Sequence, residues 1–182
     1  MSEVTHGSWI EAGLAAIANH GVEGVRVEVL AKDLGVTKGG FYRRFRDRAA
    51  LLDGILQNWS AGRIAAIEQQ TSLDGETARD RLRALIRLYS ERMNTAGMAI
   101  ELAIRQWART DPAAAAAARE VDAARLKTAS ALYRDLGLSA SEADARANET
   151  KEMPADAQKL FEELMSAIAV DEYFDLKDPV LH

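Results

Sequence analysis

Residues 27–48 constrain the fold more than any other part of the chain. Their sequence, VEVLAKDLGVTKGGFYRRFRDR, places apolar residues at helical spacing on both sides of Gly35. Glycine readily adopts the left-handed conformation that a sharp turn between two helices requires. The segment therefore predicts two short helices, over about 27–34 and 38–45, joined by a tight turn. This is the helix-turn-helix arrangement.

The remainder of the chain also has the pattern of helices. It contains three prolines and many alanines, and no stretch alternates apolar and polar residues for long enough to predict a sheet. We therefore expect an all-α protein. Besides the two helices above, helices are expected over about 9–20, 48–70, 98–109 and 112–136, with others around residues 82–93 and 154–170.

Several of these helix ends carry recognisable caps. Ser8, followed by Glu11, has the spacing of a capping box for the first helix. Thr37 and Asp47 are expected to cap the helices that follow them, whereas Arg26 precedes a helix without being able to supply the capping bond. The glycines expected to end helices are Gly21 and Gly137.

The composition excludes several classes of protein. The chain has no cysteine, so disulfides and thiolate metal sites are ruled out. No apolar run approaches the roughly 20 residues needed to cross a bilayer. The first residues lack the basic and then apolar order of a secretory signal. A cytoplasmic protein without a membrane partner is therefore expected.

The net charge of −5 hides an uneven distribution. Residues 36–48 hold five basic residues and one acidic residue, whereas residues 111–182 hold fifteen acidic and eight basic residues. A local positive patch on an acidic body is the pattern of a protein that meets nucleic acid through one surface.

The second helix of the helix-turn-helix has the chemistry of a DNA contact. The hydroxyls of Thr37 and Tyr42 suit phosphate oxygens. Arg43 and Arg44 can reach phosphates or the edges of guanine through a bidentate fork. Gly39 and Gly40 each cost about 1 kcal/mol relative to alanine in a helix, and the two costs together indicate that a groove wall approaches closely there.

These residues carry a family resemblance. The segment LAKDLGVTKGGFYRRF, followed by RDRAALLDGIL, resembles the DNA-binding head of tetracycline-repressor (TetR) type regulators. The pattern reads as alanine, a spacer, Gly-Val, Ser/Thr, a small residue, Tyr-x-x-Phe, a basic residue and leucine. The match covers about the first 55 residues closely. The matching positions are Ala31, Gly35, Val36, Thr37, Gly39, Tyr42, Phe45, Arg48 and Leu51.

The resemblance implies a transcriptional regulator, by family habit a repressor that a small-molecule effector releases from its operator. It implies a helix-turn-helix head over residues 1–47 and a helical effector-binding and dimerisation domain over residues 48–182. It also implies a homodimer on pseudo-palindromic double-stranded DNA. By matching position, with Arg26 added as a phosphate contact, the DNA-binding residues would be Arg26, Thr37, Lys38, Gly39, Tyr42, Arg43, Arg44 and Arg48.

Two departures from the family pattern bear on these expectations. Arg44 stands where histidine is common, so the preferred base does not carry over. The family's penultimate helix is normally long and apolar because it builds the four-helix dimer interface, whereas residues 139–151 are polar. The dimer interface is then expected to depend on residues 154–170.

Aromatic and methionine side chains of the body allow two interpretations. They could line an effector pocket, because helical bundles hold ligands among apolar side chains. Residues at such spacing are more often plain core. The candidates are Trp59, Tyr89, Met93, Trp107 and Tyr133.

Two other classes of protein are alternatives to a DNA-binding protein. One is a helical ligand-binding or protein-interaction module in which the head is only a scaffold. The other is an enzyme, but the chain lacks metal-ligand spacing, a glycine-rich phosphate loop after a strand and a nucleophile elbow. We therefore predict no catalytic residues, no metal site and no cofactor.

Overall fold

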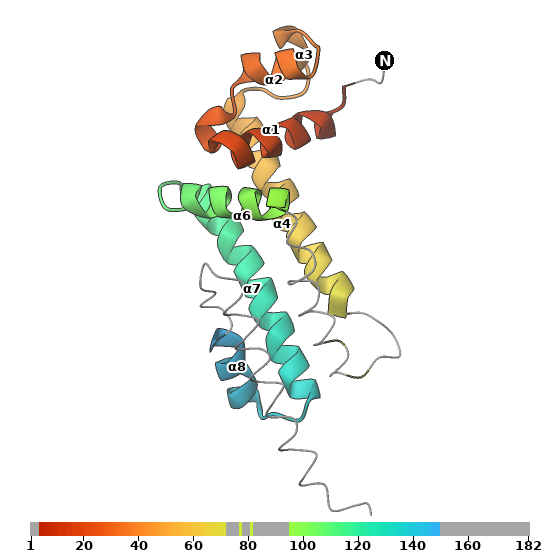
Figure 1. The fold of residues 1–182 in the computed structure, drawn as a ribbon, viewed down its shortest axis with the longest axis vertical. Coiled ribbons are helices and arrows are strands. Elements are labelled where there is room, and N and C mark those ends of the chain that lie inside the picture. The colour runs from red at the N-terminus through yellow and green to blue at the C-terminus, as the bar shows by residue number, and fades with distance from the viewer. Residues whose placement is uncertain (1–3, 72–76, 78–80, 82–94, 150–182) are drawn as a thin grey trace, which may run out of the picture. The chain divides into compact units, whose positions relative to one another are not determined.

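The structure is a computed structural model that describes residues 4–71, 77, 81 and 95–149, and within these ranges every regular element is a helix (Figure 1). This confirms the expected all-α class. The elements are α1 (His6–His20), the 3-10 helix η1 (Val22–Gly24), α2 (Val27–Asp33), α3 (Lys38–Tyr42), α4 (Arg48–Thr71), α6 (Thr95–Trp107), α7 (Pro112–Asp135) and α8 (Ala140–Glu149).

By its contacts the chain divides into two units. The first contains residues 1–68 and 93–125, and the second contains residues 69–92 and 126–182. The helix-turn-helix, α6 and the first half of α7 therefore belong to the first unit. The expected boundary at residue 47 separates a DNA-binding domain from an effector-binding domain. This boundary in function stays a prediction.

The first helix begins earlier than predicted because a different capping box starts it. The Thr5 hydroxyl accepts a hydrogen bond from the Ser8 amide at 3.2 Å, and the Ser8 hydroxyl accepts one from the Thr5 amide at 3.1 Å. Ser8 is thus the third helical residue rather than the cap, and the expected box with Glu11 is wrong. Gly21 ends the helix as predicted, at a φ of 67°.

The core of the first unit packs α1 against the helix-turn-helix and α4. Trp9 and Phe41 are fully buried and meet edge to face at 5.2 Å, and Phe41 stacks on Phe45 at 5.5 Å. A Cβ on Gly13 would lie 2.4 Å from the side chain of Ile55. The absence of that atom lets α1 approach α4 closely, which fixes the head on the start of the long helix.

Asp residues begin the two long helices, as the sequence predicts. The Asp47 carboxylate accepts the Ala50 amide at 2.8 Å, and α4 runs to Thr71, close to the predicted end. The Asp111 carboxylate accepts the amides of Ala113 and Ala114, both at 2.9 Å, at the start of α7. Between them, α6 packs along α1 and η1.

Within the second unit, the polar 139–151 stretch largely forms α8. Ser139 caps it, since its hydroxyl accepts the Glu142 amide at 3.4 Å. Its Ala143 and Ala147 are buried, so two small residues make the apolar side of this helix. The helices expected around 82–93 and 154–170 lie outside the described residues.

Candidate nucleic-acid interface

The turn before α3 has the geometry that the sequence predicts. Gly35 has a φ of 67°, and α3 begins at Lys38. The helix ends at Tyr42 rather than near residue 45, because the chain turns at Arg43 and Arg44 to enter α4. Thr37 occupies the cap position, but its side chain makes no capping bond, so the expected cap is wrong. Its exposed hydroxyl is not used by the helix.

One side of α3 is buried and the other is open to solvent. Phe41 is fully buried, whereas Tyr42 is 56% exposed. Four further predicted DNA contacts in this region are also exposed: Thr37, Gly39, Arg43 and Arg44. We call these four residues and Tyr42 the recognition surface.

A shallow hollow of about 360 Å³ borders this surface. Trp9 and Val36 contribute apolar lining, and Thr37, Arg43 and Arg44 lie around it. Two guanidinium groups and a hydroxyl therefore border one hollow of mixed polarity. That combination suits a nucleic-acid backbone, because cationic and hydroxyl groups bind phosphate oxygens.

No neighbour among the residues that the structure describes requires glycine at position 39. A Cβ there would meet only the Thr37 hydroxyl oxygen, at 3.7 Å, an ordinary contact. The φ of Gly39 is not positive either. Internal packing therefore does not explain this residue, which is consistent with the expected approach of a groove wall.

Lys38 differs from its neighbours because it has an acidic partner. Its ammonium group forms an ion pair with the Glu28 carboxylate of α2, and both side chains are largely in solvent, at 52% and 65% exposed. The hydrogen bond from Lys38 lowers the pKa of Glu28, and the same bond raises the pKa of Lys38. The sequence reasoning did not single out Glu28, which lies ten residues before its partner.

Arg48 is anchored to the backbone of the head. Its Nε donates to the Val25 carbonyl and one Nη to the Val22 carbonyl, both at 2.7 Å. These bonds hold the loop between η1 and α2 against the first turn of α4. A guanidinium has five N–H donors, so Arg48 has donors that these two bonds do not use, and its contact with a phosphate stays a prediction. Arg26 is exposed at the N-cap of α2 without a capping bond, as predicted.

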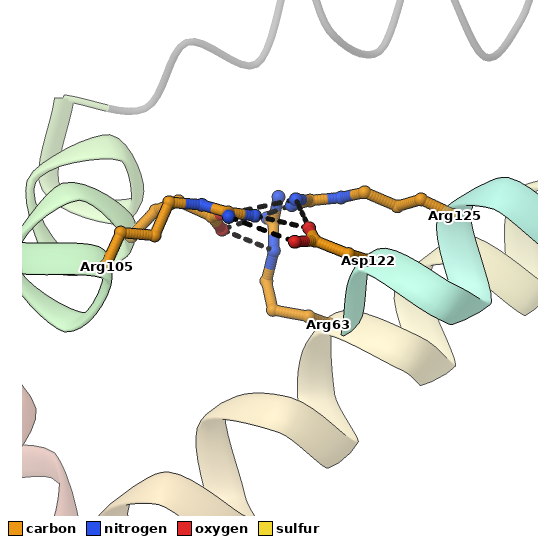
Figure 2. A network of polar contacts seen from close by, with 5 residues as sticks. Arg63, Arg105, Asp122 and Arg125 are labelled. Carbon is orange, nitrogen blue, oxygen red and sulfur yellow. Dashed lines mark hydrogen bonds and ion pairs between the residues drawn. The ribbon is translucent and has the colours of Figure 1, made fainter. Parts of the chain in front are cut away.

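A second charged cluster lies deeper in the same unit, where α4, α6 and α7 meet. Figure 2 shows Arg63, Arg105 and Arg125 converging from these three helices. Glu101 of α6 receives bonds from Arg105 at 2.9 Å and from Arg125 at 3.0 and 3.1 Å. Its contact with Arg63 is 3.2 Å.

Asp122 completes this cluster, which we call the Glu101 network. Arg105 donates to both oxygens of Asp122, at 2.6 and 3.2 Å. Burial raises the pKa of Glu101, but the surrounding guanidinium groups, led by that of Arg125, outweigh burial and hold the pKa below its ordinary value. Glu101 and Arg105 are four residues apart and Asp122 and Arg125 are three apart, a helical pairing signal that sequence reasoning could have used.

The residues predicted to bind an effector are distributed over both units. Trp59 and Trp107 are buried in the core of the first unit, which suits both interpretations given above. Tyr133 is partly buried in the second unit. Tyr89 and Met93 lie outside the described residues.

A wide hollow of about 460 Å³ lies between α4 and α7 in the first unit. Its lining consists mainly of alanines and polar side chains, and it does not include Trp59, Trp107 or Tyr133, the predicted effector residues that the structure describes. Over the part of the chain that the structure describes, no helix is both long and apolar enough to cross a membrane. The same residues contain no group of three or more metal-ligating side chains.

The comparisons with known proteins agree with this architecture. The family model of the bacterial regulatory proteins of the tetR family matches residues 10–55. The regulatory protein TetR from Rhodobacter sphaeroides has a similar structure, with a TM-score of 0.64, 28% identity, and coverage of 80% of this chain and 82% of that one. No curated protein sequence matches the chain.

Two further solved structures share the fold over most of their length. A transcriptional regulator from Rhodococcus sp. Rha1 has a TM-score of 0.66 at 21% identity, covering 91% of this chain and 86% of that one. The regulator FadR from Bacillus subtilis, solved in complex with stearoyl-CoA, has a TM-score of 0.57 at 18% identity, covering 98% of this chain and all of that one.

The helix-turn-helix is packed on the core through one side, and its second helix is followed directly by two exposed arginines, an arrangement typical of a DNA-binding protein. The match of this head to the family model and the likeness of the whole chain to solved regulators define it further. Residues 10–55 thus carry the DNA-binding head of the tetR family of bacterial regulatory proteins, and the chain is a DNA-binding transcriptional regulator similar over most of its length to a solved TetR protein.

Proposed function

We propose that the protein is a repressor that binds a pseudo-palindromic operator as a homodimer and leaves it when a small molecule binds the body. The observation that carries this proposal is the recognition surface, where exposed hydroxyl and guanidinium groups surround a short helix whose other side is fixed in the core. A scaffold helix would have no comparable reason to keep those groups in solvent.

In this proposal α3 enters the major groove of operator DNA. Arg43 and Arg44 read base edges or bind phosphates, and Gly39 allows close approach of the groove wall. Thr37, Lys38 and Tyr42 contact the phosphate backbone. Arg26 and the free donors of Arg48 bind phosphates beside the helix-turn-helix.

The remaining parts of the proposal concern the body, residues 48–182. Its effector site uses aromatic side chains, with Trp59, Tyr89, Met93, Trp107 and Tyr133 as the candidates. FadR, a protein of the same fold, was solved with stearoyl-CoA, which supports a body that accepts a small molecule. The protein acts in the cytoplasm, where the DNA is, and catalyses no reaction.

Footprinting of the purified protein on the intergenic DNA beside its own gene tests this function. We expect two protected half-sites one helical turn or a multiple of it apart, as two heads related by a twofold axis would produce. The affinity should fall steeply as salt rises, with a slope of about −0.9 per neutralised phosphate. Uniform protection of any DNA, or binding that salt does not weaken, would favour the scaffold alternative.

A further inference from the structure

The ion pair between Lys38 and Glu28 has a consequence for DNA binding. Lys38 is the first residue of α3, and Glu28 lies in the first turn of α2, so the pair joins the two helices of the helix-turn-helix. The Glu28 carboxylate thus binds the ammonium group of Lys38, and Lys38 lies on α3, the helix that the proposed function places in the major groove. A carboxylate and a phosphate offer an ammonium group the same partner, an anionic oxygen.

We propose that Glu28 is a built-in competitor of DNA for Lys38, so that binding exchanges the carboxylate for a phosphate. The inference rests on the proposed contact between Lys38 and the DNA backbone. Glu28 then lowers the affinity of the free head for any DNA. A larger share of the binding free energy must then come from contacts that only the operator sequence provides.

The exposure of the pair makes this exchange inexpensive. With side chains 52% and 65% exposed, the pair belongs to the surface class of ion pairs, whose coupling is weak because water competes for both charges. A phosphate on the DNA backbone can replace such a partner. The buried carboxylate of Glu101, which is held by three arginines, could not be displaced in this way.

A purely structural role for the pair predicts the opposite result. If Glu28 mainly braced α2 against α3, its loss would loosen the helix-turn-helix and weaken DNA binding. If it competes with DNA, its loss frees Lys38 and strengthens DNA binding. The sign of the change in affinity therefore separates the two roles.

The experiment measures binding of the full chain to a fluorescein-labelled duplex of the intergenic DNA beside its own gene, and to a scrambled duplex, by fluorescence anisotropy. Glu28→Gln should tighten both complexes by about 1.5- to 5-fold, the size of effect expected from an exposed ion pair. The fractional gain should be at least as large on the scrambled duplex. Glu28→Asp keeps the charge but shortens its reach, so it should tighten binding less.

Two controls isolate the exchange from the general loss of a negative charge. Glu11 is an exposed carboxylate on α1 without an ion pair among the described residues, and Glu11→Gln should change the affinity less than Glu28→Gln does. In the Lys38→Met background, Glu28→Gln should give no more than the Glu11→Gln effect. The thermal midpoint of each variant checks that the head remains folded.

Three results would overturn the inference. Weaker binding by Glu28→Gln would show a bracing role, and a gain equal to that of Glu11→Gln would show only long-range repulsion. Full affinity in Lys38→Met would remove the phosphate contact on which the exchange depends. The proposed function fails separately, if no duplex from the region is bound more tightly than the scrambled one.

Discussion

The Lys38–Glu28 pair and the Glu101 network use the same side-chain chemistry in opposite surroundings. The first lies on the surface of the helix-turn-helix with both members more than half exposed. In the second, the Glu101 side chain is 11% exposed and binds three guanidinium groups from three helices. Water competes for the charges of the first and has largely been removed from those of the second.

This difference indicates which charges can serve a binding partner. An exposed cation can leave its carboxylate for a phosphate at little cost, so it is available for the proposed contact with DNA. A buried carboxylate cannot lose its partners without leaving uncompensated charge in the interior. The Glu101 network is therefore expected to determine stability, and the surface charges are expected to determine affinity for DNA.

Glu101→Gln should give the largest effect because it removes the negative charge shared by three arginines and turns an amide donor toward them. We expect a loss of about 2–4 kcal/mol in the free energy of unfolding by urea, somewhat below the range for a fully buried pair because Arg63 and Arg105 are more than a third exposed. Glu120→Gln, an exposed carboxylate on α7, is the matched control and should change stability little.

Acid titration gives a second measurement on the same pair of variants. The pKa of Glu101 is lower in the folded protein than in the unfolded chain, so its contribution is complete above the unfolded pKa and disappears as the pH falls through the folded one. The free energy of unfolding should therefore fall more steeply with acid in the parent protein than in Glu101→Gln. Parallel pH profiles would mean that the network does not stabilise the fold.

Arg48 combines features of both classes, because it is bonded inside the head and is also a predicted DNA contact. It therefore tests whether one charge can affect both stability and DNA affinity. Arg48→Met removes two short bonds to backbone carbonyls and should cost about 2–3 kcal/mol of unfolding free energy. If its remaining donors also meet a phosphate, the salt slope of DNA binding should fall by about 1. Arg46→Met is the control, since Arg46 is 84% exposed and, among the described residues, bonds Asp47 alone. A comparable loss of stability in Arg46→Met would contradict the distinction.

Arg43→Ala should affect DNA binding without affecting stability. Arg43 is exposed and makes no ion pair with any residue that the structure describes. If it reads a base through a bidentate contact, affinity for the operator should fall by about 1–3 kcal/mol and affinity for scrambled DNA by less. Arg44→Ala tests its neighbour in the same way. An equal loss on both duplexes would remove base reading at the substituted position.

The sequence was informative where the pattern is local. The helix-turn-helix, the positive φ of Gly35, the Asp47 cap and the exposed arginines all follow from spacing within a few residues. The pairing of Lys38 with Glu28 was not predicted, because it depends on how two helices cross. The anchoring of Arg48 was missed for a similar reason, since its carbonyl partners lie more than twenty residues away.

The errors at helix ends have a physical cause as well. Two hydroxyl residues precede the body of α1, and the sequence alone does not decide whether Thr5 or Ser8 is the cap; the structure uses both, in one reciprocal box. Thr37 precedes α3 in the cap position, yet its hydroxyl is left unbonded by the helix. A Thr37 hydroxyl that makes no capping bond is consistent with a side chain that binds an external partner.

Gly39→Ala should give the smallest change, with opposite signs for stability and binding. Added helix propensity should raise the free energy of unfolding by about 0.5–1 kcal/mol, because the new methyl group meets only an ordinary contact with Thr37. The same methyl group should weaken DNA binding if a groove wall approaches the helix there. Gly62→Ala is the matched control, because a Cβ at that site in α4 meets nothing within 4 Å. Gly62→Ala should stabilise the protein without changing its affinity for DNA. If Gly39→Ala also leaves the affinity for DNA unchanged, the DNA does not approach the start of α3.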